Sequence, residues 1–230
     1  MMIIKGLQKL TLIDYPGKVA CTLFTFGCNF RCPYCHNPEL VIDDGSPPIP
    51  EDRILRFLNE RKNFLNGVCI TGGEPTLHTD LPEFIEKIKK MGYSVKLDTN
   101  GTNPDMLELL IDRKLVDYIA MDVKAPLEKY DEVVKVKVNI SKITRSIEIV
   151  KAFPEHEFRT TVIPELLNRE DILTIAGQLK GARRFFIQQF KPSKTLDKAF
   201  LEKQAYLVED LKRIRYEIEK LFEICEIRNV

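Results

Sequence analysis

The stretch KVACTLFTFGCNFRCPYC, residues 18–35, joins a strand pattern directly to a group of cysteines. The β-branched and aromatic residues over 18–26 predict a buried strand, and the glycine that follows ends it. Cys28, Cys32 and Cys35 then follow the spacing C-x3-C-x2-C. Three thiols this close together in one short loop can converge on one centre, so the pattern predicts a metal site at the end of the strand.

Two kinds of metal centre could use this loop, and their ligand requirements differ. A structural zinc site takes four protein ligands, and the candidate for the fourth, His36, directly follows Cys35. Adjacent residues rarely both reach one tetrahedral ion, so a zinc-binding structural module is the less favoured alternative. A cubane iron–sulfur cluster held by three thiolates would leave one iron without a protein ligand, open to bind a substrate.

The composition describes one globular domain without a strong overall charge. The chain has 230 residues, of which 44% are hydrophobic and 30% are charged, as expected for a domain with a sizeable core. Its 35 Lys and Arg nearly balance its 34 Asp and Glu, so no global attraction to nucleic acid or an anionic membrane is expected. No apolar run is long enough for a signal peptide or a membrane span. We predict a single cytoplasmic domain over residues 1–230.

The cysteines and histidines outside the loop are expected to have no role in binding or catalysis. In the reducing cytosol, six cysteines are more consistent with thiols or metal ligands than with disulfides. Cys21, Cys69 and Cys225 each stand alone in an apolar stretch and are expected to be small, buried core residues. His78 and His156 are expected to be solvated, since neither has a second ligand type at a useful spacing.

Strand and helix patterns alternate along the rest of the chain. After the first strand, the predicted strands cover residues 67–71, 94–98, 117–123, 157–163 and 183–190. The predicted helices cover residues 51–65, 80–92, 104–114, 141–153, 169–181 and, as a long final helix, 197–222. Alternation of this kind implies a parallel sheet with helical crossovers, and buried β-branched strands favour a barrel. We predict an α/β fold, a partial (β/α)6 TIM-like barrel with the cysteine loop after its first strand.

Polar segments follow most of the predicted strands, at the barrel end where active sites form. They are TGGEPT (71–76), DTNGT (98–102), MDVKAP (121–126) and QQFKPSK (188–194). The paired glycines allow a backbone to approach a ligand closely, and Glu74 offers a carboxylate to a cationic group. Asp98 and Asn100 suit a ribose or a carboxylate, or form an Asx turn before a helix. Asp122 and Lys124 point the same way and either pair with each other or leave Lys124 to bind an anion.

These residues together carry a resemblance to a known superfamily. CNFRCPYCHN resembles the cluster signature of radical S-adenosylmethionine enzymes, and GGEP resembles their GGE motif. The likeness extends over nearly the whole chain. More narrowly, LTLIDYPGKVACTLFTFGCNFRCPYCHNPEL, residues 10–40, together with DTNG and MDVKAP, is similar to the activating enzymes of glycyl-radical proteins. Within that group the segment is most similar to activators of anaerobic ribonucleoside-triphosphate reductase, with the pyruvate formate-lyase activators as relatives.

The resemblance implies a radical mechanism with one [4Fe-4S] cluster and S-adenosylmethionine. In this superfamily the fourth iron binds the methionine part of S-adenosylmethionine, and one electron cleaves the sulfonium to methionine and a 5′-deoxyadenosyl radical. In the activating enzymes this radical takes a hydrogen atom from a backbone glycine of a partner. The implied partners are anaerobic ribonucleoside-triphosphate reductase and a flavodoxin- or ferredoxin-type electron donor. Two alternatives stay open: an activator of pyruvate formate-lyase or another glycyl-radical enzyme, and a radical enzyme that acts on a small molecule.

The family's functional residues are carried over onto the matching positions of this chain. The cluster ligands implied in this way are Cys28, Cys32 and Cys35. The implied contacts to S-adenosylmethionine are Tyr34, His36, Asn37, Gly72, Gly73, Glu74, Asp98, Asn100, Asp122 and Lys124. The resemblance also implies a monovalent cation beside Asp122. Lys191 stands where relatives can present a histidine, and Arg159 either faces the pocket or lies on the surface.

Overall fold

The computed structural model describes residues 2–229 and divides the chain into two compact units. The first unit comprises Met1–Asn29, Glu39–Thr99 and Asn103–Ile119. The second unit comprises Phe30–Pro38, Asn100–Thr102 and Ala120–Val230.

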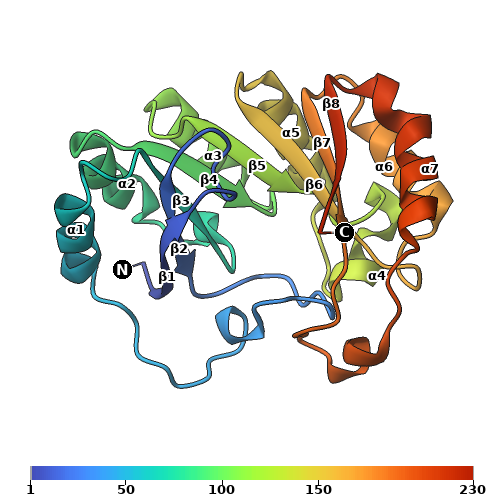
Figure 1. Cartoon of the computed structure of the whole chain (residues 1–230), viewed down its shortest axis with the longest axis horizontal. Helices are drawn as coiled ribbons and strands as arrows, with labels where there is room; N and C mark the ends of the chain where they lie inside the picture. The colour runs from blue at the N-terminus through green and yellow to red at the C-terminus, as the bar shows by residue number, and fades with distance from the viewer. Residues whose placement is uncertain (1, 230) are drawn as a thin grey trace. The chain divides into compact units, whose positions relative to one another are not determined.

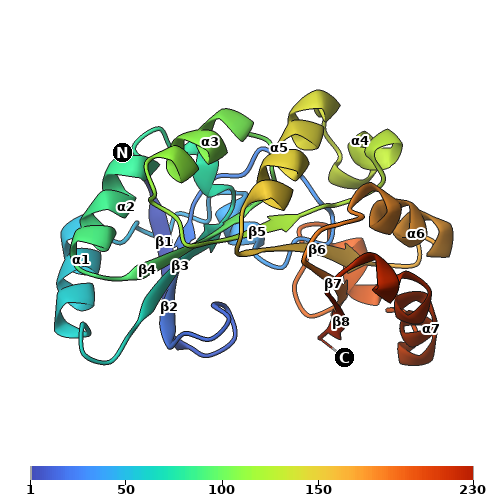
Figure 2. The ribbon, with the colours of Figure 1, turned by 90° about the horizontal axis from the view of Figure 1, so that it is seen from above.

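The first unit places helices against a set of mostly parallel strands. Its strands are β1 (Ile4–Thr11), β2 (Ala20–Thr25), β3 (Gly67–Gly72) and β4 (Ser94–Thr99). β1 pairs with β2 in antiparallel orientation, whereas β2, β3 and β4 pair in parallel. The helices α1 (Glu51–Glu60), α2 (Leu81–Lys90) and α3 (Pro104–Asp112) lie along these strands (Figure 2). Apolar residues at helical spacing, such as Ile54 and Leu58 of α1, form the buried face of each helix.

The second unit repeats the β/α arrangement. Its strands are β5 (Tyr118–Asp122), which begins in the first unit, β6 (His156–Val162), β7 (Arg184–Gln189) and β8 (Ile224–Arg228). β6, β7 and β8 pair in parallel. Its helices are α4 (Tyr130–Val134), α5 (Ile140–Ala152), α6 (Arg169–Gln178) and α7 (Val208–Ile218). Figure 1 shows α6 and α7 beside the strands β7 and β8.

The strands follow one another in the sheet in chain order, from β1 to β8. This is the order that successive β/α crossovers build in a barrel, with β1 and β8 left as the two edges of an open sheet. The predicted α/β fold with a barrel-like, mostly parallel sheet is therefore confirmed. The six predicted strands are all present, and β1, β8 and the short α4 are additional to the prediction.

The predicted long helix over residues 197–222 is confirmed only in its second half. The structure has a short 3-10 helix, Lys198–Glu202, then a non-helical stretch, and only then α7. Tyr206 lies in that stretch, where its carbonyl accepts a hydrogen bond from Gln189 Nε2 at 2.6 Å and its hydroxyl donates one to the Leu167 carbonyl at 2.5 Å. These tertiary bonds hold Tyr206 outside a helix, although the segment contains no Pro or Gly that would signal a break.

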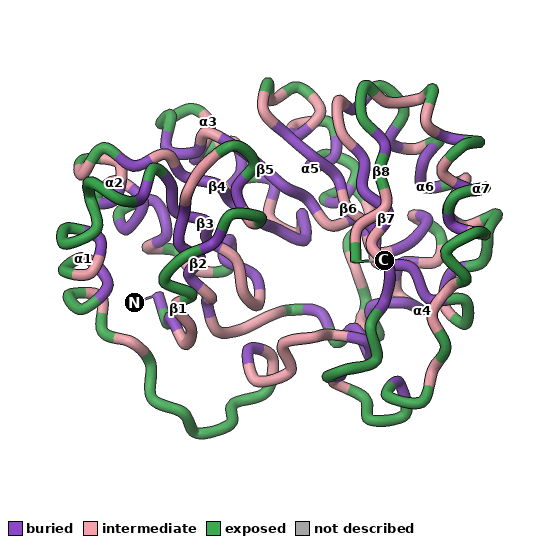
Figure 3. The backbone as a smooth tube through the Cα atoms, in the orientation of Figure 1, coloured by how far each residue is buried: buried purple, intermediate pink, exposed green. Residues whose placement is uncertain are grey.

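Buried residues are concentrated in the strands, and exposed residues in the loops and on the outer faces of the helices (Figure 3). Cys21, Cys69 and Cys225 are buried as predicted, and burial raises the pKa of Cys21 and of Cys225 to about 12. The prediction of a solvated His156 is wrong, because this residue is 1% exposed. Its ring nitrogens contact the Phe153 carbonyl at 2.5 Å and the Arg183 amide at 3.1 Å, so the fold itself uses both. His78 is half-buried, against the Phe26 carbonyl.

The described residues contain no helix with both the length and the apolar character needed to cross a membrane.

The end of β3 packs against the backbone that leads into the cysteine loop. Gly72 has a φ of +126°, and a Cβ atom there would lie 2.3 Å from the Thr25 nitrogen. A Cβ atom on Gly73 would lie 2.0 Å from the Gly27 oxygen. The Gly73 amide donates to the Thr25 carbonyl at 2.8 Å, and the next amide donates to the Gly27 carbonyl at 2.7 Å. The close approach that these glycines permit is therefore to the protein's own backbone.

We expect Gly73→Ala to lower the free energy of unfolding by about 1–3 kcal/mol, because the new methyl group overlaps the Gly27 oxygen. The measurement is urea unfolding followed by circular dichroism under anaerobic conditions. Gly177→Ala is the matched control, since a Cβ atom at this position in α6 meets nothing within 4 Å. The control should be neutral or stabilise the protein by about 0.5–1 kcal/mol. Equal unfolding free energies for the two variants would contradict the tight contact.

Candidate active site

The cysteine loop, residues 28–37, passes from the first unit into the second after Asn29. In the second unit it is held by backbone hydrogen bonds at two points. The Arg31 amide donates to the carbonyl of Val134 in α4 at 2.9 Å, and the Asp197 amide donates to the Pro33 carbonyl at 2.9 Å. The loop conformation is therefore supported by segments that lie far away in the sequence.

The three loop cysteines are thiols, with Cys32 buried and Cys28 and Cys35 half-buried. A turn closes between the last two, where the Cys35 amide donates to the Cys32 carbonyl at 3.1 Å. Within residues 2–229, no three His, Cys, Asp or Glu side chains form a group suited to a single metal ion. A cubane cluster does not need such a group, because each thiolate binds a different iron. The donor chemistry of this loop fits a [4Fe-4S] cluster.

Tyr34, between Cys32 and Cys35, has a buried hydroxyl group. This hydroxyl has no hydrogen-bond partner of normal geometry among the described residues. Burial raises the pKa of Tyr34 well above its usual value, and the nearby Cys32 and Asp122 raise it further. An unsatisfied buried hydroxyl costs about 1–3 kcal/mol. Apart from its interaction with Cys32, the hydroxyl is therefore available to a bound group.

His36 and Asn37 follow on the same loop and are half-buried. The His36 ring stacks on Phe190, with 5.8 Å between the ring centroids. Burial is the main cause that lowers the pKa of His36, so the imidazole is predominantly neutral at pH 7. Lys191, just after Phe190, is exposed to solvent.

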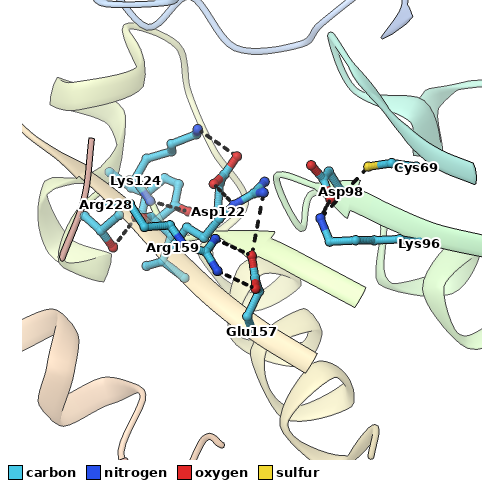
Figure 4. A network of polar contacts seen from close by, with 11 residues as sticks. Cys69, Lys96, Asp98, Asp122, Lys124, Glu157, Arg159 and Arg228 are labelled. Atoms are coloured by element: carbon cyan, nitrogen blue, oxygen red, sulfur yellow. Dashed lines mark hydrogen bonds and ion pairs between the residues drawn. The ribbon is translucent and has the colours of Figure 1, made fainter. Parts of the chain in front are cut away.

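Asp122, at the end of β5, lies between two cations (Figure 4). Its Oδ1 accepts from Arg159 Nε at 2.9 Å, and its Oδ2 lies 3.3 Å from Lys124 Nζ. Burial would raise the pKa of Asp122, but the charges of Arg159 and Lys124 hold it well below its usual range. Burial would likewise lower the pKa of Lys124, but Asp122 and Cys32 raise it. All three side chains therefore stay charged around neutral pH.

This arrangement decides two questions about Asp122 that the sequence leaves open. Asp122 and Lys124 do pair, and Arg159 faces this pair, with its side chain only 13% exposed. Both oxygens of Asp122 contact cationic side chains, and the monovalent cation that the resemblance implies there stays a prediction.

The buried carboxylate of Glu74, in the first unit, accepts hydrogen bonds from its own turn and from β4. Its Oε1 accepts from the Thr76 amide at 3.1 Å, the Thr76 hydroxyl at 2.5 Å and the Thr99 hydroxyl at 2.8 Å. The first bond caps the short 3-10 helix Pro75–Leu77. Glu74 therefore ties the end of β3 to the end of β4.

Asp98 has a cationic partner that the sequence reading does not include. Lys96 donates to Asp98 Oδ1, and its side chain is only 1% exposed (Figure 4). Its Nζ also lies 4.0 Å from Cys69 Sγ and 5.8 Å from the centroid of the Tyr118 ring. Lys96 and Asp98 are alternate residues of β4 and share one face of the strand, so a lysine at this spacing in an apolar strand is the signal that could have revealed the pair.

Asn100 forms the Asx turn that the sequence allows as one alternative. Its Oδ1 accepts from the Thr102 amide at 3.0 Å and the Thr102 hydroxyl at 2.7 Å. Gly101 has a φ of +76°, and a Cβ atom there would lie 2.1 Å from the terminal carbon of Met121. The turn therefore packs directly on β5.

A second charged pair that the sequence analysis does not include, Glu157 and Arg228, lies next to Arg159. Glu157, on β6, is 1% exposed and accepts from both terminal nitrogens of Arg228, at 2.9 and 3.1 Å. These partners are 71 residues apart in the chain, so no local sequence signal joins them.

Comparisons with known proteins agree with this chemistry. The model of the family described as Radical SAM superfamily matches residues 22–179. A protein of Methanocaldococcus jannaschii, provisionally named a glycyl-radical enzyme activating enzyme, is 35% identical, and the match covers 99% of this chain and 96% of that protein. A 7-carboxy-7-deazaguanine synthase of Archaeoglobus fulgidus is 30% identical over 71% of each chain. The pyruvate formate-lyase-activating enzyme of Clostridium pasteurianum is 25% identical over 84% of this chain and 82% of that enzyme.

The fold itself is also similar to that of a solved structure. The crystal structure of Streptococcus suis SuiB bound to S-adenosylmethionine has a TM-score of 0.64 at 18% identity, covering 88% of this chain and 48% of that one. The family match extends over more than half of the chain, and it includes the cysteine loop and the strand ends described above. The chain belongs to the radical S-adenosylmethionine superfamily.

Proposed function

We propose that this protein is an activating enzyme that reductively cleaves S-adenosylmethionine and generates a glycyl radical on a partner enzyme, anaerobic ribonucleoside-triphosphate reductase. The observation that carries the proposal is the match over almost the full length of both chains to the Methanocaldococcus protein named for glycyl-radical activation. The choice of reductase rests on the motifs in residues 10–40, DTNG and MDVKAP.

In this proposal the cysteine loop holds the cofactor. Cys28, Cys32 and Cys35 bind a [4Fe-4S] cluster, which, when bound, supplies the single electron that cleaves S-adenosylmethionine to methionine and a 5′-deoxyadenosyl radical. The electron comes from a flavodoxin- or ferredoxin-type donor. The radical removes one hydrogen atom from the partner's glycine, which leaves 5′-deoxyadenosine and a glycyl radical.

The residues around Asp122 bind the amino-acid part of S-adenosylmethionine. The Lys124 ammonium, oriented by Asp122, attracts the methionine carboxylate, and the unsatisfied Tyr34 hydroxyl donates to the bound ligand. His36, stacked on Phe190, covers the nucleoside and keeps water away from it. Gly72, Gly73 and Glu74 shape the turn that meets the methionine amino group, and Asp98 and Asn100 lie at the ribose.

A small-molecule radical reaction is the second candidate. It is favoured by the 7-carboxy-7-deazaguanine synthase of Archaeoglobus fulgidus, which is 30% identical over 71% of this chain. Such a reaction would use the same cluster and the same S-adenosylmethionine contacts, so the two candidates differ only in which molecule receives the radical.

The reconstituted enzyme, with reductant, S-adenosylmethionine and the candidate reductase, should produce a glycyl radical detectable by electron paramagnetic resonance. A reductase in which the radical glycine is replaced by alanine is the control and should give no signal. In parallel, the substrate of the Archaeoglobus synthase is added and 7-carboxy-7-deazaguanine is sought by mass spectrometry. Cleavage of S-adenosylmethionine with no radical on the reductase, together with formation of this base, would favour the second candidate.

Cys32→Ala should abolish both the cluster and the cleavage of S-adenosylmethionine, because two thiolates would remain for a site that needs three. Iron content, visible absorbance and 5′-deoxyadenosine release are measured after anaerobic reconstitution. Cys225→Ala, which changes a buried thiol of β8 outside the loop, should keep all three. Undiminished cleavage in the Cys32 variant would refute the ligand assignment.

Asp122 and Lys124 should both keep their charge from about pH 6 to about pH 9, so their contribution to the affinity for S-adenosylmethionine should not change with pH in this range. The depressed pKa of Asp122 means that its charge, present above the usual value of 3.8, is lost only at still lower pH. The raised pKa of Lys124 means that its charge, present below the usual value of 10.5, is lost only at still higher pH.

Equilibrium binding to the reconstituted enzyme checks this pH range. Lys124→Met should weaken binding by about tenfold or more at every pH in the range, since it removes a hydrogen bond between charged groups. Lys62→Met, which removes an exposed lysine outside the proposed site, serves as the control and should bind like the unchanged enzyme. If the ratio of the Kd of Lys124→Met to that of the unchanged enzyme varied with pH inside this range, the assignment of Lys124 would be wrong.

A further inference from the structure

We propose that Arg228, on the last strand, is a positioning residue for the S-adenosylmethionine carboxylate site and acts through Glu157 and Arg159. This inference rests on the proposed function, because it takes Lys124 as the group that binds the carboxylate. It adds a contribution from the C-terminal strand, which lies outside the matched residues 22–179.

Arg228 reaches across three neighbouring strands. On β8 its backbone pairs with Gln188 of β7. Its guanidinium carbon lies 3.3 Å from the centroid of the ring of Phe186, also on β7, which provides a cation–π contact. Beyond this ring, its two terminal nitrogens donate to the two carboxylate oxygens of Glu157 on β6, at 2.9 and 3.1 Å (Figure 4). This bidentate geometry fixes the direction of the Glu157 carboxylate.

Arg159 is shared between two carboxylates. It lies two residues after Glu157 on β6, so the two side chains share one face of the strand. Its Nε donates to Asp122 Oδ1 at 2.9 Å, whereas its terminal nitrogen lies 3.8 Å from Glu157 Oε1. The contact with Asp122 is therefore the shorter of the two, and Glu157 takes its short hydrogen bonds from Arg228 instead.

Five side chains form a row in which the charges alternate: Lys124, Asp122, Arg159, Glu157 and Arg228. Each of the two carboxylates lies between two cations. The loss of the cation at one end of the row therefore changes which cation each carboxylate contacts.

Removal of Arg228 should also move Arg159. Glu157 is 1% exposed, and a buried carboxylate that loses its partner is strongly destabilising unless another cation replaces it. Arg159 is 3.8 Å away and is the cation in a position to do so. As Arg159 turns toward Glu157, Asp122 loses its Oδ1 partner and binds Lys124 more strongly, which weakens the hold of Lys124 on the ligand.

The test uses three variants of the reconstituted enzyme. Arg228→Met should raise the Kd for S-adenosylmethionine by about tenfold, as expected when coupled charges are separated. Under saturating S-adenosylmethionine, kcat for its cleavage should stay within about twofold, so the effect appears in KM. Arg228→Lys keeps the charge but not the paired hydrogen bonds, and should give an intermediate Kd.

The double variant Glu157→Gln/Arg228→Met distinguishes positioning from mere stabilisation. It removes the buried carboxylate together with its partner, so no unpartnered carboxylate draws Arg159 away from Asp122. Its Kd should return to within about threefold of that of the unchanged enzyme. Arg213→Met, which removes an exposed arginine of α7, is the matched control and should leave the Kd unchanged.

Each outcome has one meaning. If the unchanged enzyme fails to bind S-adenosylmethionine, the proposed function itself is wrong. If it binds, and folded Arg228→Met binds equally well, the role of Arg228 is wrong while the proposed function stands. If the double variant binds S-adenosylmethionine as weakly as Arg228→Met does, Arg228 only stabilises β8 and does not position the site. Should Arg228→Met fail to fold, as seen by circular dichroism, the double variant and Arg228→Lys decide by the same criteria.

Discussion

The charged contacts of Asp122 organise the second unit. A carboxylate in a largely buried position is unfavourable unless cations and hydrogen-bond donors compensate for the lost water. Asp122 meets this requirement with one cation on each oxygen, Lys124 from the following turn and Arg159 from the neighbouring strand. Because each partner is itself partly buried, the three side chains fix one another's positions. The result is an ammonium group whose direction is set before any ligand arrives.

The first unit reaches a comparable rigidity through its backbone. Gly72 and Gly73 allow the end of β3 to approach the chain at Thr25 and Gly27 at distances that no side chain would permit. The Oε1 of Glu74 accepts hydrogen bonds from Thr76 in the same turn and from Thr99 of β4. A motif that superficially looks like a ligand contact thus also has a structural task, since it closes the strand ends beside the start of the cysteine loop.

The accuracy of the sequence reading varies with the distance between interacting residues. Strands β2 to β7 follow from local patterns of β-branched and aromatic residues, and the pairing of Asp122 with Lys124 follows from a spacing of two. The predicted long final helix is only partly present, because contacts between distant segments override the local pattern. Its local pattern is helical, but Tyr206 is held by Gln189 and Leu167, which belong to other segments. Strand β1 is rich in polar residues and lies at the sheet edge, so its pattern indicates no buried strand.

The sequence by itself determined the chemistry of the loop, because the spacing of Cys28, Cys32 and Cys35 along the chain limits which centre three thiols can hold. It also determined the alternation of strands and helices, which depends on local periodicity. Only the tertiary structure decided which charges that lie far apart in the sequence meet. Arg228 reaches Glu157 because β8 lies in a particular register on β7 and Phe186 supports the guanidinium between them. That register depends on the packing of the whole unit, and no short stretch of sequence contains it.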